Sequence, residues 1–366
     1  MRGSLRKILL AVVVVAVLGA LLYRARDAIG LKDFSWASLG ETLRNANWWL
    51  LLLSLAAIYF AFLLRSLRWV RFCRYMGKPG LWSVYRSTLA GFAAIFLLGR
   101  AGEPIRPILI ARKEKMPISS MFGIYVLERL FDAGSTVVIA GITLLLFPHL
   151  VAAGSESARW LAVARTTGTG LLLGLIAAIA FLIYFRLHGA QAMERRLESW
   201  KTHHGWRARV AGIFGGFSEG LQAIRTVADL AIALAYSAVH WTLIVLIYVW
   251  ISHSFGGRLA TVDMPGAMLV LAFSMVGSTV QLPGVGGGSQ VACYIALTLF
   301  LGVESGPAVA AAVVIWLITF AGSTLAGIPL LMHEGWSMGE LRRMARAEAE
   351  AEASGTHIPA PPEPHR

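Results

Sequence analysis

Long apolar runs dominate this chain, and they constrain its fold more than any other feature. A helix needs about 20 apolar residues to cross a hydrocarbon layer of about 30 Å. Hydrophobic residues make up 57% of the sequence and charged residues only 14%, far from the balance of a water-soluble domain. The alternating apolar and polar strands of a membrane barrel are absent from the sequence. We therefore predict an all-α polytopic membrane protein with about six transmembrane helices, at residues 8–23, 48–64, 133–147, 168–185, 228–251 and 307–332.

The positive charge of the chain is strong but localised. The net charge of +13 would suit a nucleic-acid-binding protein. Lysine and arginine gather in particular loops, however, as the positive-inside rule expects of a membrane protein. We therefore expect membrane lipids, and no nucleic acid, as partners. The two cysteines, Cys73 and Cys293, form no disulfide or metal-binding pattern, and we predict no metal ion or other cofactor.

The basic clusters also predict how the chain runs through the membrane. Basic residues precede the first span and place the N-terminus in the cytoplasm. Two further basic clusters, at 65–86 and 112–115, fall on the same side. Residues 81–111 must then enter the membrane and return, as a re-entrant hairpin with its turn near 99–107. Residues 265–303 must do the same from the outer side.

The two halves of the chain, about 1–150 and 160–335, share this plan. Each contains two spans, a hairpin broken by glycine and proline, and a third span, and the second half has the opposite orientation. Inverted repeats with interrupted helices at matching positions are typical of secondary transporters. We expect a membrane domain at 1–340 with a cytoplasmic loop at 186–227. A disordered cytoplasmic tail follows at 341–366.

The broken hairpin of the first half carries charge. Its turn reads GRAGEPIRP over residues 99–107 and contains Arg100, Glu103 and Arg106. Hydrocarbon tolerates neither broken backbone nor bare charge unless protein or water surrounds them. The spacing of three residues puts all three side chains on one side of a helical turn. The arginines could bind a phosphate; alternatively, the three residues form a salt-bridged knot that closes the hairpin.

A second charged group, Glu128, Arg129 and Asp132, lies at the start of the next predicted span. The i, i+4 spacing puts Glu128 and Asp132 on one face of a helix, with Arg129 adjacent. That face could line a cavity, where the carboxylates would take a proton or a cationic headgroup. Alternatively, the group is an ion pair at the helix end, near the cytoplasmic interface.

The broken hairpin of the second half is rich in glycine. Backbone amides exposed in such a segment could form an anion-binding nest, although glycine also serves simply to turn the chain tightly. The Lys-Ser/Thr pair that ends a nucleotide-binding P-loop is missing, so ATP is not expected. The candidate residues are Pro283, Gly284, Gly286, Gly287 and Gln290.

Arginine recurs at every third position after the second predicted span. The residues are Arg65, Arg68, Arg71 and Arg74. Such a strip could contact lipid phosphates at the cytoplasmic surface. It could equally act only as a topology signal, and we interpret it in that way.

Three motifs together resemble a known family. GRAGEPIRP at 99–107, ERLFD at 128–132 and PGVGG at 283–287 occur in this order, as in the flippase-like membrane family that includes the transmembrane region of lysylphosphatidylglycerol synthase. The likeness covers about residues 5–335. It implies a bacterial inner-membrane protein, with both termini cytoplasmic, that translocates lipids or lipid-linked precursors.

Two departures limit what the resemblance implies. The full synthases carry a soluble aminoacyltransferase domain after the membrane region, whereas a short acidic, proline-rich tail follows Met332 here. Lysyl transfer is therefore not expected, and we predict no catalytic residues. The family's glycine motif often ends in a glutamate where this chain has Gln290. Any proton coupling would then have to use Glu103, Glu128 or Asp132.

Residues and resemblance together predict a lipid flippase that moves an anionic lipid or lipid-linked precursor between leaflets. Arg100 and Arg106 would hold the headgroup in the first hairpin, and the amides of residues 284–288 would meet it from the outer side. Two alternatives stay open. One is a membrane enzyme acting on a lipid phosphate, with Glu103 or Asp132 as acid or base. The other is a non-catalytic scaffold for an envelope- or lipid-building enzyme that docks on the cytoplasmic loop.

Overall fold

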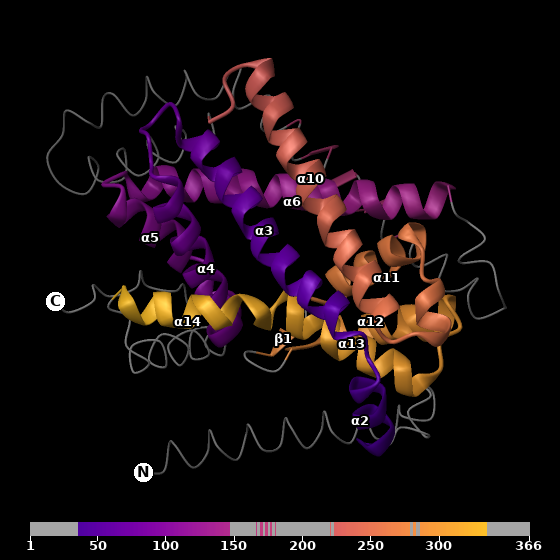
Figure 1. Cartoon of the computed structure of the whole chain (residues 1–366). Helices are drawn as coiled ribbons and strands as arrows, with labels where there is room; N and C mark the ends of the chain where they lie inside the picture. Colours follow the sequence, from indigo (N-terminus) through magenta and orange to yellow (C-terminus); the bar gives the residue numbers. More distant parts are fainter. Residues whose placement is uncertain are drawn as a thin grey trace, which may run out of the picture.

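The computed structural model describes residues 36–146, 220, 223–278, 281–282 and 286–334, with isolated positions between 166 and 180 (Figure 1). The predicted spans at 8–23 and 168–185, the tail and nearly all of the loop at 186–227 lie outside the described residues. The regular secondary structure of the described part is helical except for one pair of two-residue strands. Four of its segments are long and apolar enough to cross a membrane: Trp48–Cys73, Leu81–Leu98, Val227–Ser254 and Ser305–His333. The predicted all-α polytopic architecture is confirmed.

The described elements fall into two series of similar order. The first series is α2 (Trp36–Arg44), α3 (Trp48–Cys73), α4 (Leu81–Leu98), the 3-10 helix η2 (Gly99–Gly102), α5 (Ile105–Lys113) and α6 (Ile118–Leu146). The second is α10 (Val227–Ser254), the 3-10 helix η5 (Gly257–Thr261), α11 (Met264–Gly277), β1 (Gln281–Leu282), β2 (Gly286–Gly287), α12 (Gly288–Ile295), the π-helix η6 (Ala296–Phe300), α13 (Ser305–Thr319), the 3-10 helix η7 (Ala321–Ser323) and α14 (Thr324–His333).

The two long helices α3 and α10 pack side by side in antiparallel orientation (Figure 1). At one end of the pair the backbone N–H of Asn47 donates to the carbonyl of Ser254 at 2.7 Å. At the other end the hydroxyl of Tyr75 donates to Asp229 at 2.7 Å. Each helix begins at a capping residue, Asn47 for α3 and Thr226 for α10, so their starts are set by sequence.

The first hairpin, α4–η2–α5, brings the residues before α4 and after α5 together. Gly99 turns the chain with a φ of 65°, a conformation that disfavours side chains. Gly102 lies so close to the backbone of Ala94 that a Cβ would overlap it. The N–H of Gly80, before α4, donates to the carboxylate of Glu114, after α5, at 3.1 Å. The broken segment therefore folds the chain back to the C-terminal end of α3.

The second hairpin, α11–β1–β2–α12–η6, closes at the opposite end of the α3–α10 pair. Its strands pair antiparallel, with Gln281 opposite Gly287. Gly277 meets the carbonyl of Gly288, where a Cβ would not fit. Arg258, before α11, donates to the carbonyl of Leu301, after η6, at 3.0 Å. The hairpin thus starts and ends beside the C-terminus of α10.

The last predicted span is not one continuous helix. We expected residues 307–332 to run unbroken, but α13 ends at Thr319 and α14 begins only at Thr324, with η7 between them. The carbonyl of Gly322 turns toward α3, where it accepts a hydrogen bond of 2.8 Å from the hydroxyl of Tyr59. This distant contact joins the break to α3.

The helix packing repeats between the halves. In each half the long helix packs on the first arm of its own hairpin, and the two arms pack on each other. The second arm packs on the helix that follows it, α5 on α6 and α12 on α13. Across the halves, α14 packs on α4 and α6 packs on α11. Because α3 and α10 are antiparallel, the predicted opposite orientation of the halves holds in the described residues.

Candidate functional site

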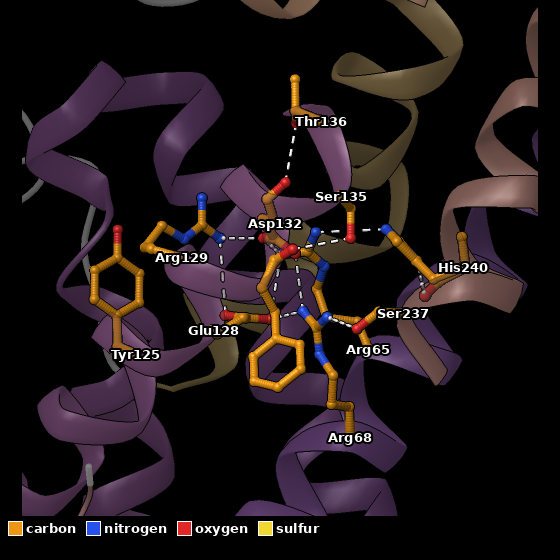
Figure 2. A network of polar contacts seen from close by, with 12 residues as sticks. Arg65, Arg68, Tyr125, Glu128, Arg129, Asp132, Ser135, Thr136, Ser237 and His240 are labelled. Carbon is orange, nitrogen blue, oxygen red and sulfur yellow. Dashed lines mark hydrogen bonds and ion pairs between the residues drawn. The ribbon is translucent and has the colours of Figure 1, made fainter. Parts of the chain in front are cut away.

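A cluster of charged side chains fills the space between α3, α5, α6 and α10 (Figure 2). We call it the arginine network and define it as Arg65, Arg68, Arg106, Glu128, Arg129 and Asp132. Arg65, Arg68, Arg106, Glu128 and Asp132 are all buried. Charges at such positions in membrane helices are rare and usually functional.

Two arginines of α3 meet two carboxylates of α6. Asp132 accepts from Arg65 at 2.8 Å and from Arg68 at 2.9 Å. Glu128 accepts from the same two guanidinium groups at 3.2 and 3.3 Å. The i, i+3 spacing of the arginines and the i, i+4 spacing of the carboxylates put each pair on one helix face, and the two faces oppose each other.

Helix α10 supplies further contacts to these arginines. The hydroxyl of Ser237 accepts from Arg68 at 2.6 Å. The ring of His240 lies 3.1 Å from the carbonyl of Ala61 through Nδ1 and 3.4 Å from Arg65 through Nε2. A carbonyl only accepts and a guanidinium only donates, so His240 is a neutral imidazole with its proton on Nδ1.

Arg106 enters the network from α5, between two aromatic rings. Its guanidinium carbon lies 4.6 Å from the ring centre of Trp69 and 5.6 Å from that of Phe92. It forms an ion pair with Glu128. Gly91 of α4 makes this approach possible, because a Cβ at that position would overlap the Cβ of Arg106.

Glu103, Tyr125 and Arg129 lie at the rim of the network. The hydroxyl of Tyr125 donates to the carboxylate of Glu103. Arg129 is 40% exposed and makes looser ion pairs of 3.4 Å with Asp132 and 3.7 Å with Glu128. Its guanidinium lies over the ring of Tyr125, at 5.2 Å from the ring centre. The rim residues are therefore less tightly held than the buried ones.

The predicted residues of the first hairpin do not form the cluster within the turn that their spacing suggested. Glu103 bonds Tyr125 and Arg106 bonds Glu128, both on α6, where the i, i+3 spacing predicted a cluster within the turn. The backbone of Arg100 belongs to η2, and its side chain lies outside the described residues. Glu128 and Asp132 point inward onto arginines.

The glycine motif belongs to the other hairpin. Gly286 and Gly287 form β2, and the side chain of Gln290 turns back onto the N–H of Gly287. Pro283 and Gly284 lie outside the described residues. The expectation that the amides of this motif face the same ligand as Arg106 stays a prediction.

Sequence reasoning missed the inward role of Arg65 and Arg68. We interpreted the arginine strip as a topology signal, but its first two members are buried in the network. Only Arg71 and Arg74 lie near the helix end, where both pair with Asp229, at 3.2 and 2.9 Å. The signal was available, because Arg65 directly follows an apolar run and charges within such a helix face the protein interior.

The network holds more positive than negative charge and keeps donors unused. Four arginines face the carboxylates of Glu128 and Asp132. Within the described residues, buried donors without a hydrogen-bond partner include Arg65 Nε, Arg68 Nε, Arg106 Nη1 and Trp69 Nε1. Each such group typically costs about 1–3 kcal/mol. The arrangement can therefore accept an anion with several oxygen atoms. No three acidic, histidine or cysteine side chains of the described part are placed to hold a metal ion.

Comparison with known proteins agrees with this picture. The family model described as the lysylphosphatidylglycerol synthase TM region matches residues 8–327. No curated protein and no solved structure matches the chain. The match covers most of the chain and both hairpins. The protein is therefore a multi-pass membrane protein that belongs to the family of the lysylphosphatidylglycerol synthase TM region, which is linked to lipid metabolism or transport.

Proposed function

We propose that this protein is a lipid flippase, which moves an anionic lipid or lipid-linked precursor between the leaflets of a bacterial inner membrane. The observation that supports the proposal is the surplus of buried arginine, with unused donors, in a membrane protein. A purely structural ion-pair network needs no such surplus, since unpaired buried charge is strongly destabilising. A lipid headgroup would supply the missing anion.

The arginine network lies at a depth in the membrane that a lipid headgroup would pass while it crosses between leaflets. Arg65 lies about 12 Å before the end of α3 at Cys73, at a rise of about 1.5 Å per residue. Glu128 lies about 15 Å into α6 by the same rise. A hydrocarbon layer is about 30 Å thick. These positions are deep enough that a lipid phosphate would reach them only by leaving its own interface.

In this proposal Glu128 acts as a built-in counter-anion for Arg106. Glu128 forms an ion pair with Arg106 and would neutralise it whenever no headgroup is bound. An arriving phosphate takes over Arg106, while Glu128 keeps its bonds to Arg65 and Arg68. Release returns Arg106 to Glu128. The exchange keeps Arg106 paired with an anion at both stages.

The two hairpins give this exchange a route. We propose that both are re-entrant and that they enter from opposite membrane faces. Their ends meet at opposite ends of the α3–α10 pair. With cytoplasmic termini, the first hairpin opens toward the cytoplasm and the second toward the outside. Rocking of one half against the other would expose the network to each leaflet in turn.

The first test is Arg106→Ala in proteoliposomes that contain a fluorescent phosphatidylglycerol, with leaflet transfer followed by dithionite quenching. We expect lipid transfer to fall to the level of protein-free liposomes, because the variant lacks the Arg106 guanidinium that would bind the phosphate. Arg112→Ala is the matched control, since Arg112 is an exposed arginine of the same helix. Unchanged transfer by a folded Arg106→Ala variant contradicts the proposal.

The proposal makes the chain a transporter without catalytic residues. A scaffold would behave differently in the same assay, because loss of Arg106 would leave its partner enzyme bound. An enzyme acting on a lipid phosphate would convert the lipid, which mass spectrometry of the recovered liposomes detects. Either result replaces the transport proposal.

A further inference from the structure

The arginine network touches a buried histidine of α10 that has no part in the exchange proposed above. His240 is 5% exposed and points from α10 toward Arg65 of α3 (Figure 2). We infer, on the basis of the proposed function, that His240 takes up one proton when an anionic headgroup binds and releases it when the headgroup leaves. The protein is then a proton-coupled lipid transporter, and His240 carries the proton.

The contacts of the ring keep His240 neutral while Arg65 lies beside it. Nδ1 lies 3.1 Å from the carbonyl of Ala61 and carries the ring proton. Nε2 lies 3.4 Å from Nη2 of Arg65, which can only donate. A second proton on Nε2 would set two positively charged donors against each other. Arg65 therefore decides whether the ring can be protonated.

Few other charges bear on this ring. Besides Arg65, the charged groups that face it are Arg68 of α3 and Asp132 of α6. Asp132 accepts from both arginines, so its negative charge is already shared between them. Helices α11 and α13, which also pack on α10, contain no charged residue. A change at Arg65 is therefore felt directly by His240.

An anion bound to Arg65 would remove the obstacle to protonation. The contact with His240 is longer than those of Arg65 with Glu128, at 3.2 Å, and Asp132, at 2.8 Å, so it yields first when the guanidinium turns toward a headgroup. The negative charge of the headgroup offsets that of Arg65. A proton from solution then adds to Nε2, which donates to a phosphate oxygen, and no other bond changes. By linkage, the protonated ring binds the anion more tightly.

The carboxylates of the network are poorer proton carriers. Glu128 and Asp132 each accept from both Arg65 and Arg68. Protonation of either would weaken the pairing of two buried guanidinium groups, which is costly. Histidine is also the side chain whose charge ordinarily changes near neutral pH. The sequence pattern pointed to carboxylates for proton coupling, and the contacts favour His240.

Coupling makes the headgroup and the proton cross together without net charge. A pH gradient would therefore drive the lipid toward the alkaline side, and the membrane potential would not. The test uses proteoliposomes with fluorescent phosphatidylglycerol, a potential clamped by potassium and valinomycin, and an interior about one pH unit more alkaline than the outside. Dithionite quenching gives the share of lipid in each leaflet. The inner-to-outer ratio should approach about tenfold, which equals roughly 1.4 kcal/mol.

Three variants identify the proton carrier. His240→Gln offers Arg65 an acceptor but takes no proton, so its leaflets should stay equal under the gradient. His240→Asn, which can still donate to Ala61, is the second variant if the first does not fold. Glu103→Gln removes the carboxylate at the rim and should keep the tenfold ratio. His253→Gln is the matched control, because His253 lies on the same helix and bonds a carbonyl away from the network.

A second measurement covers a variant that folds but transfers no lipid. Native mass spectrometry of protein in nanodiscs compares retention of phosphatidylglycerol at about pH 6 and about pH 8, on either side of the ordinary histidine titration. The unmodified protein should retain more at the lower pH, and His240→Gln should retain equal amounts at both.

The outcomes separate this inference from the proposed function. Equal leaflets for the unmodified protein under the gradient overturn proton coupling and leave the flippase proposal in place. A tenfold ratio in His240→Gln, or loss of the ratio in Glu103→Gln, overturns the role of His240 in the same way. An unmodified protein that neither transfers nor retains lipid overturns both.

Discussion

The two hairpins have the same packing plan but different interiors. In the first half, the region between the hairpin and the helices around it holds the arginine network. In the second, α11, α12 and α13 contain no charged residue. A small cavity lies there instead, lined by Tyr248, Ser274, Ser289, Cys293, Ala312, Ile315, Trp316, Thr319 and Phe320. The described part of the second half therefore closes such a hairpin without charge in these three helices, which supports the proposal that the arginines of the first half bind a ligand.

The largest difference between the halves should appear when buried partners are removed. Glu128→Ala leaves Arg65, Arg68 and Arg106 short of a carboxylate, and we expect it to lower the free energy of unfolding by about 3–5 kcal/mol. Ser274→Ala is the counterpart in the second half. Ser274 is an uncharged side chain that donates to the carbonyl of Val270 in its own helix, so a smaller loss of about 1 kcal/mol is expected. Thermal unfolding in detergent measures both variants. Equal losses of stability would contradict the expected difference between the two halves.

The glycines at the two hairpin turns should instead behave alike. A Cβ at Gly102 meets the backbone of Ala94, and one at Gly277 meets the carbonyl of Gly288. We expect Gly102→Ala and Gly277→Ala to destabilise by about 1–3 kcal/mol each, as overpacking does. Gly141→Ala in α6 is the control, because nothing lies within 4 Å of its Cβ position. A loss of stability in only one of the two variants would show that the two halves do not share this close packing.

The smallest effect concerns the caps of α3 and α10. Asn47→Ala and Thr226→Ala should each lower the free energy of unfolding by about 1 kcal/mol, because each removes a side-chain acceptor from a helix start. The two caps lie at opposite ends of the helix pair. Their losses should therefore add to within about 0.5 kcal/mol in the double variant. Strong non-additivity would show that the pair responds as one unit.

Local pattern predicted much of the fold. Hydropathy and the placement of glycine, proline and basic residues predict the long helices α3 and α10, the two broken hairpins and the opposite orientation of the halves. Contacts between distant residues decided the rest. At the break before α14, the carbonyl of Gly322 accepts a hydrogen bond from Tyr59, which lies 263 residues away in the sequence. Leu81–Leu98, predicted as a short hairpin arm, is long enough to count as a candidate span.

The candidate site was predictable in part for the same reason. Glu128, Asp132 and Arg106 stand out as charges within or beside apolar segments, and all three belong to the network. Their partners were not predictable, since a helical spacing says which side chains share a face but not which helix that face meets. Arg65 reaches carboxylates more than 60 residues away, and Arg68 reaches Ser237 across 169 residues.

The long sequence separation between the arginines of α3 and the carboxylates of α6 has a consequence for biosynthesis. Arg65 and Arg68 enter the membrane with α3, before Glu128 and Asp132 have been translated. At roughly 5–20 residues per second, the ribosome needs several seconds to reach α6. During that time α3 must carry two unneutralised guanidinium groups, each unfavourable by about 2.5–3.5 kcal/mol at the centre of an inserting helix. Insertion of α6 then relieves this cost, because Glu128 and Asp132 pair with both arginines.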